Sequence, residues 1–137
     1  MAVKVLQAGL DPDVIDYSAP EFARFAGLTP EVLRKANDDN VAALRASGFD
    51  VDNVLLDPAT AVAAIRAAVA ATRYDAVLIG AGVRMVASTT LLFEELVNLV
   101  HSELPGARFV FNKAPEATPD DILRWFDSAE ATSPRAR

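Results

Sequence analysis

The sequence contains no cysteine and only one histidine among its 137 residues. This inventory excludes disulfide cross-links, thiolate nucleophiles and the common Cys/His zinc sites. Any catalysis must therefore use carboxylates, hydroxyls, lysine, arginine or backbone amides. The lone His101 falls inside a predicted helix beside Asn98 and Glu94, where a surface or interface position is favoured over a catalytic role.

Positive charge is scarce as well, because 13 Lys and Arg residues face 19 Asp and Glu residues, for a formal net charge of −6. This balance argues against a nucleic-acid partner, since a phosphate backbone would be repelled. No apolar run approaches the ~18 residues that a membrane-spanning helix needs. The first apolar run begins at Val3 without a signal-peptide core before it, so we expect a cytoplasmic protein that does not contact the membrane.

What the chain has in abundance is apolar sequence, at 52% of its residues, which is enough to bury one core. Short β-rich runs alternate with longer helical patterns, as is typical of βα units. We expect one α/β domain over residues 1–127 and a disordered tail over 128–137, where periodicity is lost. The predicted strands are Val3–Ala8, Val51–Leu56, Ala76–Ile79 and Arg108–Asn112.

A helix is predicted after each strand, and three of these helices begin with a capping residue followed by proline. Right-handed crossovers then give a three-layer, Rossmann-like or flavodoxin-like sandwich with a four-stranded parallel sheet in the order 2-1-3-4. In such sheets ligands bind outside the carboxyl ends of the strands, here between strands one and three. The proline-containing helix starts are Thr29-Pro30, Asp57-Pro58 and Thr118-Pro119.

The predicted helix from Pro30 to about Ser47 carries two asparagines, Asn37 and Asn40, at helical spacing with its apolar residues. Either or both can face the sheet with their amides hydrogen-bonded. A solvated Asn-Asp-Asp-Asn run is the favoured alternative, because asparagine is mostly exposed in proteins.

The predicted helix over 88–104 is apolar around most of its circumference. A helix on one face of a sheet needs only a single apolar stripe, so we expect a second buried surface. That surface is either a homodimer interface, which we favour, or one covered by the long amino-terminal loop. The apolar residues are Leu91, Leu92, Phe93, Leu96, Val97, Leu99, Val100 and Leu104.

The connection over residues 9–28 is far longer than the roughly 2–6 residues normal for a βα loop. It is too apolar for a solvated linker, and Pro20–Ala26 can form a short helix. Two interpretations stay open, a lid over the site and a packed excursion that covers a sheet edge or the second face of the helix over 88–104. The apolar residues of this segment are Val14, Ile15, Tyr17, Phe22 and Phe25.

Three carboxylates lie in the same segment, at Asp11, Asp13 and Asp16. They are candidate acids or metal ligands, but their spacing gives no octahedral cage, and solvated loop carboxylates are the default. We therefore predict no metal site and keep Asp11 as a weak candidate for a general base. The sequence indicates no particular cofactor.

The run Tyr74–Arg84 is the most informative stretch, because a short apolar strand breaks into a glycine-containing turn before a helix. Backbone amides, the start of that helix and the cations Arg84 and Lys113 suit a phosphate or carboxylate group. The full dinucleotide fingerprint is missing, since Met85 stands where its third glycine belongs, and no Walker sequence occurs. We predict that a small anionic ligand is held by Gly9, Gly80, Gly82, Arg84, Asn112 and Lys113.

Two stretches resemble the receiver domains of bacterial response regulators. Tyr74–Ile79 is similar to their third strand, and Lys113-Ala114-Pro115 is similar to their lysine-proline turn. The resemblance implies a doubly wound α/β fold. Gly80 stands where those domains carry the phosphoacceptor aspartate, so the resemblance extends at most to a degenerate relative that is not phosphorylated.

Two functions follow from these observations. The first is a small cytoplasmic protein, possibly a small enzyme, that binds an anionic ligand at the carboxyl edge of the sheet. The second is a noncatalytic interaction module that dimerises through the helix over 88–104. Arg84 separates them, because a side chain that points into the crevice favours binding, whereas a surface pair with Asp75 or Glu94 favours the module. In the binding case, Arg84→Ala weakens ligand binding with little change in stability.

Overall fold

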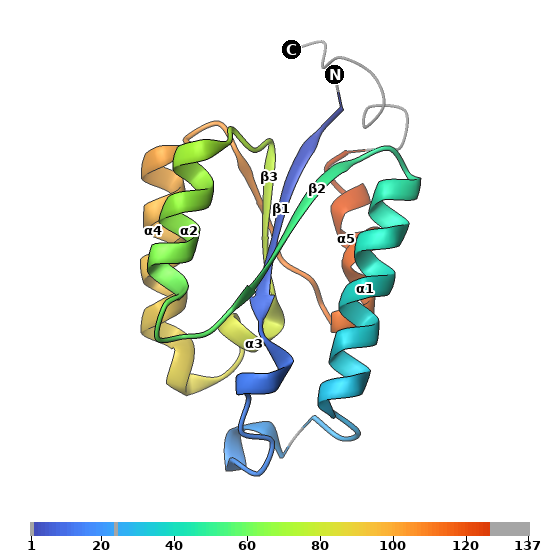
Figure 1. Ribbon diagram of the computed structural model, residues 1–137, viewed down its shortest axis with the longest axis vertical. Coiled ribbons are helices and arrows are strands. Elements are labelled where there is room, and N and C mark those ends of the chain that lie inside the picture. Colours follow the sequence, from blue (N-terminus) through green and yellow to red (C-terminus); the bar gives the residue numbers. More distant parts are fainter. Residues whose placement is uncertain (1, 24, 127–137) are drawn as a thin grey trace.

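The computed structural model describes residues 2–23 and 25–126 of the chain. The predicted tail over 128–137 lies outside these residues, so the division of the chain at 127 stays a prediction. The sheet has four parallel strands in the order β2-β1-β3-β4, which confirms the predicted α/β topology (Figure 1). The strands are β1 (Lys4–Leu10), β2 (Asp50–Leu56), β3 (Ala76–Ile79) and β4 (Arg108–Val110).

The helices form a layer on each face of the sheet (Figure 1). One layer holds α1 (Pro30–Ala46) and α5 (Thr118–Leu123), and the other holds α2 (Ala61–Ala71) and α4 (Thr90–Glu103). A single short turn of helix, α3 (Ala81–Arg84), follows β3 directly. None of the helices within the described ranges is both long and apolar enough to cross a membrane.

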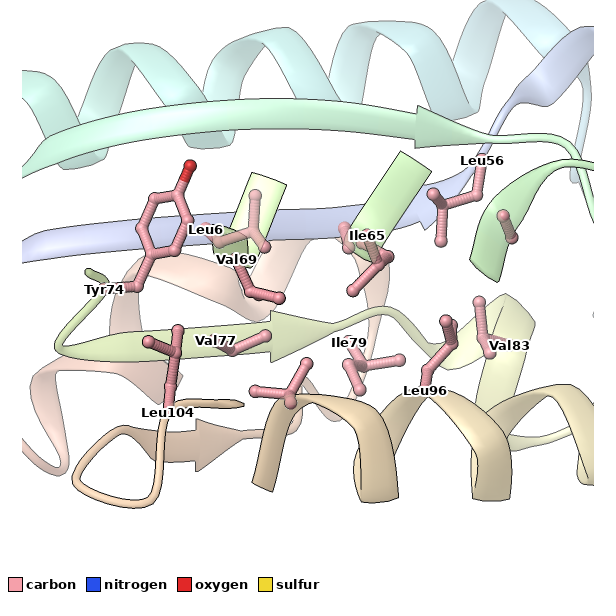
Figure 2. Packing of buried hydrophobic residues seen from close by; sticks show 13 residues of the cluster. Leu6, Leu56, Ile65, Val69, Tyr74, Val77, Ile79, Val83, Leu96 and Leu104 are labelled. Atoms are coloured by element: carbon pink, nitrogen blue, oxygen red, sulfur yellow. The ribbon is translucent and has the colours of Figure 1, made fainter. Parts of the chain in front are cut away.

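Side chains alternate along β1 between the two helical layers, as the two-residue period of a strand requires. Leu6 and Ala8 belong to the apolar cluster on the α2 and α4 side, which Figure 2 shows in close-up. Val3 and Val5 belong to the cluster on the α1 and α5 side. Gln7 and Gly9 are on the same side of β1 as Val3 and Val5. The side of the sheet that faces α1 therefore changes from apolar residues to a polar and a small residue toward the carboxyl end of β1.

A side-chain cap marks the start of α1. The hydroxyl of Thr29 accepts a hydrogen bond from the backbone N–H of Val32 at 3.1 Å, so α1 begins at Pro30 as predicted. In contrast, α2 begins at Ala61 and not at Pro58. There the Asp57 carboxylate accepts from the N–H of Ala59 at 2.9 Å, which stabilises a separate turn ahead of the helix.

The apolar circumference of α4 has an intramolecular explanation in large part. Leu96 and Val100 are buried against the sheet, and α2 lies beside α4 in the same layer (Figure 1). Phe93 meets the ring of Phe111 edge-on, with 5.8 Å between the ring centroids. Leu91 stays 77% exposed. The homodimer through this helix stays a prediction. The exposed apolar surface of α4 is smaller than the sequence pattern suggests.

The long connection after β1 contains two short 3-10 turns, η1 (Pro12–Val14) and η2 (Pro20–Phe22). The second takes the place of the longer helix expected over Pro20–Ala26. The hydroxyl of Tyr17 donates to the carbonyl of Pro12 at 2.7 Å, which closes the segment on itself. Figure 1 shows this segment beneath the carboxyl ends of the strands, between β1 and α1.

Tyr74 provides a test of the packing at the opposite end of the sheet. Its hydroxyl donates to Oδ2 of Asp52 at 2.6 Å, and burial together with this hydrogen bond raises the pKa of Tyr74 to about 12. Between pH 10 and 12 the unfolded chain therefore loses a proton that the folded chain keeps. The free energy of unfolding should fall with rising pH across this window.

Tyr74→Phe should remove this contribution to the pH dependence and cost about 1 kcal/mol at neutral pH, through the lost hydrogen bond. Urea unfolding of the wild type and the variant at several pH values between 8 and 12 measures both effects. Parallel pH profiles for the two proteins would show that the Tyr74 hydroxyl is not held as described.

Candidate functional site

A cavity of about 210 Å³ lies at the carboxyl ends of β1 and β3, on the side of the sheet that α1 and α5 cover. The long segment after β1 contributes Pro12, Ile15, Phe22, Phe25 and Leu28 to its wall, so both interpretations of this segment stay open. Most of the wall is apolar, and its large apolar residues include Leu10, Ile15, Phe22, Phe25, Leu28 and Leu33. This is the crevice in which the sheet topology predicts a ligand.

Four side-chain amides interrupt the apolar wall, from Gln7, Asn37, Asn40 and Asn112. Gln7 Nε2 donates to Asn37 Oδ1 at 3.1 Å, and Asn40 is 5% exposed. The favoured expectation that Asn37 and Asn40 belong to a solvated run is therefore wrong, because α1 turns both toward the sheet. The alternative that these asparagines face the sheet is correct, and their helical spacing with Leu33 and Leu44 indicated it.

Three predicted glycines line the cavity together, and each has a different environment. A Cβ atom at Gly80 would lie 3.3 Å from the Cα of Gly9, so Gly80 allows close contact between the chain after β3 and the end of β1. A Cβ at Gly82 would lie 3.2 Å from Cδ1 of Leu10. A Cβ at Gly9 would meet nothing within 4 Å, which makes Gly9 a place where β1 leaves open space.

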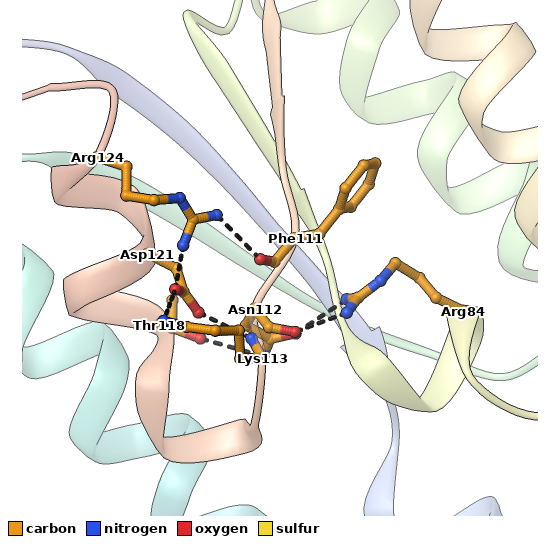
Figure 3. Close-up of polar contacts among 7 residues, drawn as sticks. All are labelled: Arg84, Phe111, Asn112, Lys113, Thr118, Asp121 and Arg124. Carbon is orange, nitrogen blue, oxygen red and sulfur yellow. Dashed lines mark hydrogen bonds and ion pairs between the residues drawn. The ribbon is translucent and has the colours of Figure 1, made fainter.

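Arg84 takes neither of the two positions that the sequence left open. Its guanidinium donates to the carbonyl of Asn112 at 2.6 Å and to Oδ1 of Asn112 at 3.0 Å (Figure 3). The same guanidinium donates to the carbonyl of Ile79 at 2.6 Å. It also lies over the Phe111 ring, 5.2 Å from the centroid. Burial lowers the pKa of the Arg84 guanidinium, although the charge of Asp121 acts in the opposite direction. Arg84 is thus a link between the ends of β3 and β4 and does not belong to the cavity wall.

This link also explains why β4 is shorter than predicted. We expected the strand to run to Asn112, but regular pairing ends with Leu78 opposite Val110. Beyond that point the guanidinium, and not a strand ladder, joins the carbonyls of Ile79 and Asn112. Asn112 is buried at this position, and its Nδ2 donates to Oγ1 of Thr118 at 3.3 Å.

Asp121 anchors the connection between β4 and α5, and nothing in the sequence pattern singled it out. Its carboxylate is buried and accepts from the backbone N–H of Lys113 at 2.8 Å (Figure 3). Arg124 donates to the other carboxylate oxygen and, at 3.3 Å, to the carbonyl of Phe111. The predicted site residue Lys113 is therefore fixed through its backbone. Its side chain is 78% exposed, and its ammonium lies 3.8 Å from Oδ1 of Asp121, so the charge of Lys113 is paired with that carboxylate.

The loop carboxylates have partners within their own part of the surface. Asp11 accepts from the N–H of Asp13 at 2.9 Å, and Asp13 pairs with Arg34 at 2.8 Å. The hydroxyl and backbone N–H of Ser18 both donate to Asp16 and lower its pKa. The candidate base Asp11 is absent from the cavity wall, and residues 2–23 and 25–126 hold no cluster of carboxylates and histidine able to bind a metal ion.

Comparisons of the chain with family models, with curated proteins and with solved structures find no match. The function must therefore be argued from the chemistry of the cavity itself. Within the described part of the chain, Lys113 is the only ionisable side chain on the cavity wall. The structure thus brings together Gly9, Gly80, Gly82, Asn112 and Lys113, adds the unpredicted Gln7, and sets Arg84 behind the wall.

The position of Arg84 changes what its replacement should do. Arg84→Ala removes three hydrogen bonds, two to backbone carbonyls and one to the Asn112 side chain, so we expect a loss of roughly 2–3 kcal/mol in the free energy of unfolding. Arg84→Lys keeps the charge but lacks the planar guanidinium, so its free energy of unfolding should lie between those of the wild type and of Arg84→Ala. Urea denaturation measures both variants. A loss below about 0.5 kcal/mol for Arg84→Ala, as for an ordinary surface residue, would contradict the link.

Proposed function

We propose that the protein binds a small molecule with an apolar body and one polar end in the cavity at the carboxyl ends of β1 and β3. The observation that carries the proposal is the combination of an apolar wall with amide side chains at the carboxyl ends of β1 and β3. Ligand sites in proteins are typically apolar hollows in which a few placed polar groups fix the orientation of the ligand.

The size of the cavity limits the ligand. A cavity of about 150 Å³ holds benzene, so a cavity of about 210 Å³ suits a somewhat larger molecule, such as a substituted benzene or a fused bicyclic ring. A nucleotide or a peptide segment exceeds this space by far. The proposal therefore concerns small metabolites and not macromolecules.

The charge of the ligand follows from where the cations lie. The exposed ammonium of Lys113 pairs with Asp121 at 3.8 Å, so a ligand anion would share it with that carboxylate, and the donors of Arg84 are directed at carbonyls behind the wall. The inner part of the cavity offers amides and no cation among the described residues. We infer that the buried end of the ligand is uncharged and that an anionic group, where the ligand has one, lies at the rim beside Lys113.

The dimerising module has narrower support. The exposed apolar side chain that favours it on α4 is Leu91, since the sheet and α2 cover much of the rest of this helix. A single exposed leucine is ordinary on a protein surface.

Sedimentation equilibrium of the wild type and of Leu91→Glu tests this alternative, and an association that the variant abolishes would support it.

Gly9 provides the sharpest test of the binding proposal. Its absent side chain faces open space, so Gly9→Leu should fold normally and should even gain stability, because glycine weakens a strand. The new side chain should fill the cavity and abolish ligand binding. Gly9→Ala should have a smaller effect on binding. Thermal unfolding with and without a panel of ring compounds measures both stability and ligand binding. A ligand at 100 times its dissociation constant adds ~2.7 kcal/mol to the free energy of unfolding.

Gly106→Leu is the matched control, because a Cβ atom there also meets nothing within 4 Å, but the residue lies in an exposed turn far from the cavity wall. It should leave ligand binding as in the wild type. A panel that leaves the wild type unchanged, or one that stabilises Gly9→Leu as much as the wild type, would contradict the proposal.

A further inference from the structure

Gln7 is an unusual residue for its place in the fold. It lies within β1 between Leu6 and Ala8, which are fully buried, and is itself 5% exposed. Strand alternation turns it toward α1, on the same side as Gly9 but deeper in the sheet. A buried amide is costly unless each of its polar atoms has a hydrogen-bond partner. An apolar residue would be the ordinary choice at this position, so the presence of a buried amide at Gln7 needs an explanation.

The orientation of the Gln7 amide is determined by its neighbours. Nε2 donates to Asn37 Oδ1 at 3.1 Å and to Asn53 Oδ1 at 3.4 Å. Asn37 uses its own Nδ2 to donate to Asp38 at 3.3 Å, which leaves its Oδ1 as the acceptor for Gln7. A reversed Gln7 amide would place its oxygen against two oxygens. The network thus directs the nitrogen to Asn37 and Asn53 and leaves Oε1 as the other polar atom of the side chain.

Gln7 Oε1 accepts no hydrogen bond from the protein, and it is the one buried side-chain polar atom within the described ranges for which this holds. The residue lines the cavity. The amide of Asn112, by comparison, is satisfied on both sides, because Oδ1 accepts from Arg84 and Nδ2 donates to Thr118. Oε1 is thus a buried acceptor without a partner, on a residue of the cavity wall.

We propose that Gln7 is the specificity-determining residue of the cavity and that its Oε1 accepts a hydrogen bond from a hydroxyl or N–H group at the buried end of the ligand. The inference rests on the proposed function and names the ligand class, namely small apolar alcohols, phenols and N–H heterocycles. A carboxylate or phosphate at the inner end is excluded, because its oxygens would face another acceptor without a cation beside them.

Sites built to bind a hydroxyl group discriminate strongly against an analogue that lacks it, because the buried partner then stays unsatisfied. Three ring compounds of nearly the same shape test this: 4-methylphenol carries a donor, p-xylene replaces the hydroxyl by a methyl group, and 4-methylbenzoate carries an acceptor-only anion. The wild type should bind 4-methylphenol at least about tenfold more tightly than either of the others.

Gln7→Met keeps the length of the side chain and removes the acceptor. It should abolish the preference, so that p-xylene binds at least as tightly as 4-methylphenol. Asn53→Ala is the matched control, because it removes a partner of Gln7 that lies outside the cavity wall, and the preference for the phenol should persist. Ligand-observed NMR titration gives the dissociation constants, and circular dichroism confirms that each variant is folded.

The outcomes separate the two proposals. If wild-type protein binds the ring compounds without a preference for 4-methylphenol, or if Gln7→Met keeps that preference, the role of Gln7 is overturned while the cavity remains a binding site. If none of the three compounds binds, the binding proposal fails and the role of Gln7 fails with it. Should Gln7→Met not fold, the ranking of the three compounds by the wild type decides alone.

Discussion

The guanidinium of Arg84 is the interaction on which the carboxyl edge of this sheet depends. The strands β3 and β4 are short, and their regular pairing ends before the chain reaches α5. Arg84 continues the connection by binding the carbonyls of Ile79 and Asn112, with its flat face against Phe111. Backbone carbonyls that are removed from water need such donors, and one arginine satisfies several of them at once.

The cavity is a consequence of that connection. Asn112, held by Arg84, bonds to Thr118, while the buried carboxylate of Asp121 holds the backbone of Lys113. These contacts fix the wall on the α5 side, and Gly80 lets the chain after β3 approach the end of β1. The open space lies where Gly9 has no side chain, and the segment after β1 covers it. The wall that these contacts hold is the one against which we propose that a small molecule binds.

Much of the fold could be predicted from the sequence, because hydrophobic periodicity and helix caps such as Thr29-Pro30 are local signals. The place of the cavity was also predictable, since the sheet order brings Gly9 and Gly80 to one edge. The role of Arg84 was not, because the direction of a long side chain depends on which carbonyls the strand ends leave free. Gln7 gave a signal that was missed, as a polar residue inside an apolar strand is expensive to bury. Asp121 gave none, since its burial depends on how α5 docks.

The most direct test of the account is a crystal structure of the protein grown with saturating 4-methylphenol. We expect one ring inside the cavity, with its hydroxyl oxygen about 2.8 Å from Gln7 Oε1, and Arg84 still bound to the carbonyls of Ile79 and Asn112. A cavity filled by the protein's own side chains, with the ring absent or bound elsewhere on the surface, would contradict the central claim that this edge of the sheet is a ligand site.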